Sequence, residues 1–173
     1  MNNDELIVHT PIFDVLKRNE VESGFRPIAV KSPDWVAICA QKDGKWLLTK
    51  QLRFGTMSEI EEFPCGCVEE NEDPKVAAIR ELSEETGYNV SLNDLYFLGK
   101  FAANPGFMTN FMHYFFVDLD KVRFVKSEQH LDVHEKLTVY WKDKDIFRKE
   151  FNETEIKPIF VAGMFYLLDQ LNK

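Results

Sequence analysis

Three glutamates near the middle of the sequence have a spacing that is chemically useful. Glu81, Glu84 and Glu85 are three and four positions apart, so on a helix their carboxylates share one face, with Cβ atoms about 5–6 Å apart. Carboxylates at this spacing repel one another, and toward the C-terminal end of a helix the macrodipole disfavours them as well. A divalent cation such as Mg²⁺ removes both penalties, because it binds carboxylate oxygens and keeps water ligands for phosphate groups. The alternative is the solvated face of an ordinary glutamate-rich helix.

A helix between Asp73 and Gly87 is needed to bring these carboxylates together, and the sequence supplies both of its ends. Asp73 is a suitable N-cap, Pro74 suits the first helical position, and Gly87 can adopt the left-handed conformation that ends a helix. Arg80 can pair with Glu84 one turn further on, which would hold the acidic patch in place.

The residues around this helix decide between the two interpretations. Five residues separate Gly66 from Glu72, and seven more separate Glu72 from the run Arg-Glu-Leu-Ser-Glu-Glu-Thr-Gly-Tyr at 80–88. This pattern resembles the signature of the Nudix hydrolases, with Tyr88 in place of an aliphatic residue as a mild variation. Its seven fixed residue types, each found at roughly one position in fifteen, agree by chance on the order of 10⁻⁸ times per start position. The chain is therefore identified as a member of that family.

The resemblance implies an α/β (α+β) fold, in which a mixed β-sheet is sandwiched between helices and carries an N-terminal β arm. It also implies hydrolysis of a nucleoside diphosphate linked to another group, with Mg²⁺ or Mn²⁺ as the cofactor. By position in the motif, Glu81 and Glu85 are the expected principal metal ligands, and Glu84 is a further ligand or orients the attacking water. The backbone carbonyl of Cys65 is also expected to reach the metal.

The same resemblance gives Arg80 and Glu72 an organising rather than a chemical role, and it requires Gly66 where the chain turns sharply. Catalysis is then electrostatic: metal ions clamp the pyrophosphate, orient a water in line and stabilise the leaving phosphate. The acidic residues of the motif would bind the cations that make this site attractive to phosphate.

Features outside the motif resemble the ADP-ribose pyrophosphatase branch of the family, whose members cleave ADP-ribose and related nucleotide sugars into two monophosphates. These features are the 34 residues before Trp35 and three short runs: Gln-Leu-Arg at 51–53, Glu-Phe-Pro-Cys-Gly at 62–66 and Asn-Pro-Gly-Phe at 104–107. By this analogy Arg53 should contact the pyrophosphate, because a guanidinium fork suits phosphate oxygens. The alternative for Arg53 is an exposed charge at the end of a strand.

One position departs from the pattern of that branch. A glutamate that serves as metal ligand or catalytic base often follows the loop proline by five residues, and here that position holds Asn110. An amide can orient a water or a ribose, but it cannot accept a proton. We therefore predict Glu135 as the catalytic base, with Glu128 as the second choice, in a segment where related enzymes have a mobile loop. Direct activation of the water by Glu84 is the alternative.

Two aromatic residues, Trp35 and Phe107, are candidate stacking partners for the base of the substrate. The alternative is a core position, which is more common for an aromatic residue near the start of a strand. The resemblance further implies a homodimer, because the N-terminal strands of this branch typically cross to a second subunit. Residues 1–34 are the expected dimerisation arm, and residues 35–173 the expected Nudix hydrolase domain.

The rest of the sequence predicts the elements that position this site. Runs of β-forming residues at 35–42 and 45–54 flank Asp43 and Gly44, a pair that favours a hairpin with a type I′ turn. We also expect two or three short strands over 5–32, loop and turn over 55–72, strands at 95–102, 111–119 and 137–141, and an apolar-faced helix over 157–172. Strands with two helices that do not alternate strictly favour a mixed sheet with helices packed on it.

The composition narrows the class of partner. The chain has 21 basic and 29 acidic residues, a net charge of −8, which disfavours binding to nucleic acid or to an anionic membrane. No apolar run approaches the roughly 18 residues of a membrane span, and three cysteines suggest no disulfide framework. The first residues lack the features of a signal peptide. We therefore expect a cytoplasmic protein whose partner is a small nucleoside diphosphate.

Three other interpretations stay open. Cys65, Cys67, His130 and His134 could bind structural zinc, although Cys-x-Cys is not the usual spacing. A Nudix fold could also be kept for sensing a nucleotide sugar without turnover, which the intact glutamates disfavour. Among enzymes, a hydrolase of nucleoside triphosphates, dinucleotides or capped RNA is the second choice.

Overall fold

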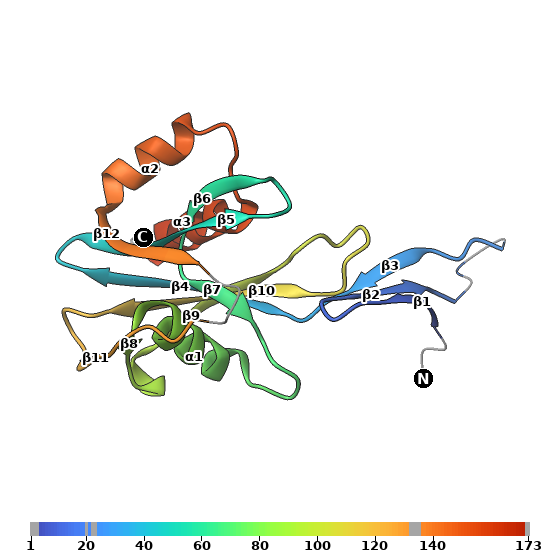
Figure 1. Cartoon of the computed structure of the whole chain (residues 1–173), viewed down its shortest axis with the longest axis horizontal. Helices are drawn as coiled ribbons and strands as arrows, with labels where there is room; N and C mark the ends of the chain where they lie inside the picture. The colour runs from blue at the N-terminus through green and yellow to red at the C-terminus, as the bar shows by residue number, and fades with distance from the viewer. Residues whose placement is uncertain (1–3, 20, 22–23, 132–135, 172–173) are drawn as a thin grey trace.

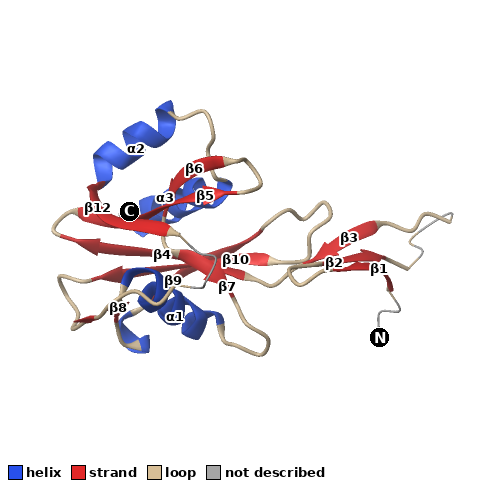
Figure 2. Cartoon of the chain, in the orientation of Figure 1, coloured by secondary structure: helices blue, strands red, loops and turns tan. Residues whose placement is uncertain are grey.

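The computed structural model describes residues 4–19, 21, 24–131 and 136–171. At its centre is a seven-stranded mixed sheet (Figure 2). Its strands are β4 (Trp35–Lys42), β5 (Lys45–Arg53), β6 (Ser58–Glu62), β7 (Cys65–Cys67), β9 (Tyr96–Ala102), β10 (Phe111–Asp118) and β12 (Leu137–Asp143). Five of them lie in the order β12-β5-β4-β10-β9, while β6 pairs with β5 and β7 with β4. β4 and β10 are parallel, and the other pairs are antiparallel.

Helices cover both faces of this sheet, which confirms the expected α+β fold (Figure 1). They are α1 (Pro74–Thr86), α2 (Lys144–Glu153), α3 (Ile159–Leu171) and the short 3₁₀ helix η1 (Leu92–Asp94). α1 lies on one face, and α2 and α3 lie on the other. Within the described residues, none of these helices is both long enough and apolar enough to cross a membrane.

Strand β4 joins the two layers of the core, because successive side chains of a strand point to opposite faces. Val36 and Ile38 pack on the side of α1, together with Leu82 of that helix. Ala37 and Cys39 pack on the side of α2 and α3. Since both faces of β4 are buried, its register in the sheet is strongly specified.

The predicted hairpin is confirmed. Asp43 and Gly44 join β4 to β5 with φ angles of 50° and 71°, the left-handed values that a type I′ turn requires at both central residues.

The interpretation of 55–72 as loop and turn was wrong in part, because β6 and β7 lie within it. β6 is the sequence Ser-Glu-Ile-Glu-Glu, whose glutamates have little preference for strands. Its pairing with β5, from Thr49–Glu62 to Arg53–Ser58, supplies what the local sequence lacks.

Helix α2 was also missed, so the described chain has three α-helices and not two. Asp143 caps it by accepting hydrogen bonds from the backbone N–H groups of Asp145 and Ile146, at 2.9 and 3.1 Å. Only Phe147 and Phe151 of this helix are buried. Two apolar residues among charged ones form too narrow an apolar face to predict a helix from the sequence.

The expectation of two or three strands before the main sheet is confirmed as three. β1 (Glu5–His9), β2 (Asp14–Lys17) and β3 (Ile28–Lys31) form an antiparallel sheet that extends away from the helices (Figure 1). This arm joins the body where the N–H of Val30 donates to the carbonyl of Phe107 at 2.7 Å, and that of Thr109 donates to Val30 at 3.0 Å.

A two-stranded sheet lies near the C-terminal end of α1. It pairs β8 (Tyr88–Asn89) with β11 (Val125–Lys126). The segment after β11 is thereby held against the helix, where the N–H of Ser127 donates to the carbonyl of Gly87 at 2.8 Å.

Candidate active site

Helix α1 has the ends that the sequence predicts. The side chain of Asp73 accepts a hydrogen bond from the N–H of Lys75 at 2.8 Å, and Pro74 is the first helical residue. Gly87 ends the helix in the left-handed conformation, with φ of 73°, and its N–H donates to Ser83 at 2.7 Å. Since both ends are set, the glutamates at 81, 84 and 85 are fixed relative to one another.

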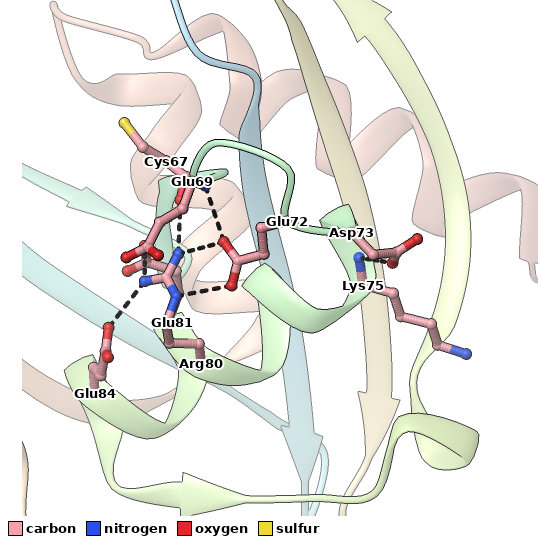
Figure 3. A network of polar contacts seen from close by, with 8 residues as sticks. All are labelled: Cys67, Glu69, Glu72, Asp73, Lys75, Arg80, Glu81 and Glu84. Carbon is pink, nitrogen blue, oxygen red and sulfur yellow. Dashed lines mark hydrogen bonds and ion pairs between the residues drawn. The ribbon is translucent and has the colours of Figure 1, made fainter.

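Arg80 binds three of the acidic side chains around it (Figure 3). Nε and Nη2 donate to Glu72 at 3.0 and 2.9 Å, and Nη1 donates to Glu81 at 2.8 Å and to Glu84 at 3.0 Å. Nη2 also donates to the carbonyl of Cys67 at 2.9 Å. These contacts account for all five N–H donors of a guanidinium. Hydrogen bonding to Glu72 is the main reason why the pKa of Arg80 is raised.

Glu81 and Glu85 both reach strand β7. A Cβ atom added to Gly66 would lie 2.0 Å from Cδ of Glu81, so only glycine leaves room for this carboxylate. Glu85, which is 1% exposed, accepts a hydrogen bond from the N–H of Cys65 at 3.0 Å. The two expected principal metal ligands therefore lie at neighbouring residues of β7: Glu85 at Cys65, whose carbonyl is also an expected ligand, and Glu81 at Gly66.

Arg53 lies at the end of β5, next to Cys65 of β7. Its Nη2 forms an ion pair with Glu62 and donates to Sγ of Cys65 at 3.1 Å. Although burial alone would lower the pKa of Arg53, Cys65 and Glu62 raise it above its ordinary value. The guanidinium is thus a permanent positive charge beside Cys65 and Glu62.

A cleft of about 630 Å³ brings these residues together. Its lining includes Gln51, Leu52, Arg53, Phe54, Cys65, Gly66, Cys67, Arg80, Glu81, Glu84 and His130. Two cationic and two anionic side chains in one concave site are suited to a substrate that carries phosphates together with bound cations.

The described chain does not bring every predicted residue into this cleft. Trp35 pairs with Cys67 across β4 and β7 but lines a separate apolar pocket of about 480 Å³ on the α3 side. Phe107 is half exposed in the loop that holds the arm. Asn110 is 1% exposed, and its amide atoms have no hydrogen-bond partner among the described residues. The three stay predictions as substrate contacts.

The segment expected to carry the base runs beside α1. The N–H of His130 donates to the carbonyl of Glu84 at 2.9 Å, and the side chain of Gln129 donates to the carbonyl of Glu85. Glu128 is exposed in this segment, whereas Glu135 and His134 lie outside the described residues. The prediction of Glu135 as base is therefore untested.

Two residues of this region were not assigned to the active site from the sequence: Glu62, which is buried against Arg53, and His130, which was considered only as a zinc ligand. Glu62 begins the run at 62–66, and its position two residues after the buried Ile60 gives it an inward direction in a strand. His130 reaches the cleft through the pairing of β11 with β8, which has no local signal in the sequence.

The donor atoms around β7 fit a hard divalent cation, because Glu81, Glu84, Glu85 and a backbone carbonyl supply only oxygen. Within the described ranges, no group of three or more His, Cys, Asp or Glu side chains is already arranged to hold a metal ion. Glu81 and Glu84 are instead bound to Arg80, and Glu85 to the N–H of Cys65.

Comparisons with known proteins agree with this geometry. A family model described as the NUDIX domain matches residues 31–161. ADP-ribose pyrophosphatase of Bacillus subtilis (strain 168) is 35% identical over 111 residues, which cover 61% of this chain and 59% of that protein. The methanol dehydrogenase activator of Bacillus methanolicus is 39% identical over 85 residues, 49% of this chain and 45% of that protein. The matches thus span about half the length of these curated relatives.

A solved structure is similar over nearly the whole chain. The crystal structure of an ADP compounds hydrolase has a TM-score of 0.79 and 21% sequence identity, and the match covers 98% of this chain and 91% of that one. At this identity the similarity concerns the fold.

Proposed function

The chain belongs to the Nudix family, and we propose that it hydrolyses the pyrophosphate bond of ADP-ribose or a related nucleotide sugar, giving AMP and a sugar phosphate. The observation that carries this proposal is the cleft lined by Glu81 and Glu84 of the motif together with Arg53. The relative named ADP-ribose pyrophosphatase supports the choice of substrate.

We assign the cofactor site to oxygen donors around β7. Glu81 and Glu85 would hold Mg²⁺ or Mn²⁺, with Glu84 as a further ligand and the carbonyl of Cys65 beside them. When bound, such a cation neutralises the pyrophosphate and makes a coordinated water more acidic. Arg80 fixes the directions of Glu81 and Glu84, so its role in this proposal is organisation.

The other residues contribute binding and proton transfer. Arg53 binds the pyrophosphate, and Glu135, or Glu128 as second choice, accepts the proton of the attacking water. Glu84 is well placed for the alternative, since its side chain is 42% exposed at the cleft. Asn110 orients the ribose or a water, and Trp35 and Phe107 stack on the base.

We propose a homodimer formed through the arm, with residues 35–173 as the catalytic domain. Leu6, Ile7 and Val8 of β1 are 55%, 47% and 45% exposed, an unusual run of apolar side chains for a free surface. Sedimentation should give twice the mass of the chain, and a monomer at micromolar concentration would contradict the dimer. The cytoplasmic location also stays a prediction.

A substrate panel tests the function. ADP-ribose, ADP- and UDP-sugars, dinucleotides and nucleoside triphosphates are incubated with the protein and Mg²⁺, and phosphate products are measured. We expect fastest turnover of ADP-ribose or an ADP-sugar. Turnover of triphosphates alone would overturn the substrate assignment, and binding of a nucleotide sugar without turnover of any compound would favour the sensing alternative.

A further inference from the structure

Glu62 is a charged residue at a position where a strand normally carries an apolar one. Side chains of β6 alternate: Ile60 and Glu62 point inward and are 6% and 0% exposed, whereas Glu59 and Glu61 point to the other face. Burial of a carboxylate is costly unless it is paired and hydrogen-bonded. Glu62 therefore needs an explanation that its neighbour Glu61 does not.

The contacts of Glu62 compensate only part of this cost. Oε1 pairs with Arg53 and accepts a hydrogen bond from Nε2 of Gln51 at 3.0 Å. Oε2 is buried and has no hydrogen-bond partner within the described part of the chain. Burial accordingly raises the pKa of the Glu62 carboxyl, although Arg53 acts in the opposite direction. Apolar residues can often replace a buried ion pair without loss of stability. A contribution to stability therefore does not explain why position 62 carries a buried glutamate.

The partner of Glu62 is held at one end only. Arg53 uses Nη2 for both Glu62 and Sγ of Cys65, and its Nε and Nη1 donate to no other described residue. The Arg53 side chain is 40% exposed and lines the cleft. Three N–H bonds are thus available to an anion, from a guanidinium whose far side is anchored in the interior.

We propose that Glu62 is a positioning residue, which anchors Nη2 of Arg53 so that its remaining N–H groups face the pyrophosphate of the substrate. This inference rests on the proposed function. An arginine free in solvent would lose the entropy of its rotatable bonds each time it bound phosphate, and the anchor removes this cost before binding. Gln51 holds the anchor in place from the same strand as Arg53.

Removal of the Glu62 charge has two opposite effects on substrate affinity, and the test must distinguish them. The negative charge of Glu62 also weakens the attraction of Arg53 for an anion, so its removal could tighten binding. We expect anchoring to dominate, because Glu62 lies behind the guanidinium and the substrate contacts the other donors. In Glu62→Gln, Kd for ADP-ribose should rise about tenfold, as should KM, while kcat stays within about twofold.

The test is a double-mutant cycle with Arg53→Ala, measured in two ways. Calorimetry gives Kd for ADP-ribose in the presence of a chelator, and kinetics with Mg²⁺ give KM and kcat. Arg53→Ala should weaken binding about thirtyfold, and the double variant should differ from it by less than about twofold, because Glu62 acts through Arg53. Glu61→Gln is the matched control: Glu61 pairs with Lys142 at 2.6 Å on the other face, and its loss should leave Kd and KM unchanged.

A second carboxylate variant separates position from charge and guards against misfolding. Glu62→Asp keeps the charge but is too short for the anchor, so it should weaken binding as Glu62→Gln does. Tighter binding by Glu62→Gln, wild-type behaviour of Glu62→Asp, or additive effects in the cycle would each overturn the proposal. Binding of ADP-ribose without hydrolysis by the wild type would overturn the proposed function alone, since the Kd cycle then still decides the role of Glu62. A wild-type protein that neither binds nor hydrolyses ADP-ribose would overturn the proposed function and the role of Glu62 together.

Discussion

Two arginines line one cleft, and their surroundings differ in a way that separates their roles. Arg80 lies on helix α1, and all five of its N–H donors form hydrogen bonds, to Glu72, Glu81, Glu84 and the carbonyl of Cys67. Arg53 lies at the end of β5, and among the described residues only its Nη2 has partners, Glu62 and Cys65. A saturated guanidinium organises the protein, whereas one with unused donors can bind a ligand. The number of unused donors, rather than position in the cleft, therefore distinguishes the two roles.

Of the two arginines, Arg80 is expected to give the larger effect. Arg80→Ala removes the cation that Glu72, Glu81 and Glu84 share in the described chain, and it should lower the free energy of unfolding by about 3 kcal/mol. Activity should fall up to about 100-fold, because residues that orient metal ligands have effects of this size. Denaturant unfolding and steady-state kinetics measure both. Native stability in this variant would contradict an organising role.

Gly66→Ala should separate activity from stability. The added Cβ would lie 2.0 Å from Cδ of Glu81, the mobile end of a flexible side chain, so the carboxylate can move and the fold can survive. A displacement of about 1 Å at a catalytic group costs roughly 100-fold in rate. We expect that loss of kcat/KM with a melting temperature close to that of the wild type. Gly55→Ala is the control, because it also adds a methyl group to the lining of the cleft but meets no atom within 4 Å.

Arg53→Lys tests the other side of the comparison. The ammonium keeps the charge opposite Glu62 but lacks the planar fork, so KM should rise about tenfold while the free energy of unfolding changes little. Kinetics with ADP-ribose and thermal unfolding provide the two readouts. A loss of stability as large as that of Arg80→Ala, with KM unchanged, would show that Arg53 is structural too.

The smallest effect concerns pH, and its sign differs between the two regions. Hydrogen bonding from Arg80 lowers the pKa of Glu72 in the folded protein. This carboxylate therefore stabilises the fold at pH values above its unfolded pKa of about 4.3, and the stabilisation is lost as the pH falls through the folded pKa. Burial raises the pKa of Glu62, so acidification relieves a cost there. Relative to Glu72→Gln, the wild type should lose about 1 kcal/mol or less as pH falls below about 4. Relative to Glu62→Gln, it should gain stability. Parallel pH profiles would contradict this difference.

The sequence predicts the surroundings of Arg80 much better than those of Arg53. The helix around Arg80 is set by local signals, since Asp73 and Gly87 define its ends and the pair with Glu84 follows from one helical turn. The contacts of Arg53 depend on β6 and on the pairing of that strand with β5, and a short glutamate-rich strand carries little local preference. His130 reaches the cleft, and Glu62 reaches Arg53, only through such non-local pairing. The acidic half of the site is thus encoded locally, and the basic half requires the folded sheet.

Release of AMP from ADP-ribose tests the central claim most directly. The wild type and Glu85→Gln are compared with Mg²⁺ and with a chelator, and far-UV circular dichroism verifies the fold of each. We predict metal-dependent AMP release by the wild type and a loss on the order of 10³-fold in Glu85→Gln, because one of the two principal ligands is removed. Full activity in Glu85→Gln, or undiminished AMP release in the chelator, would contradict the assignment of this cleft as a metal-dependent active site.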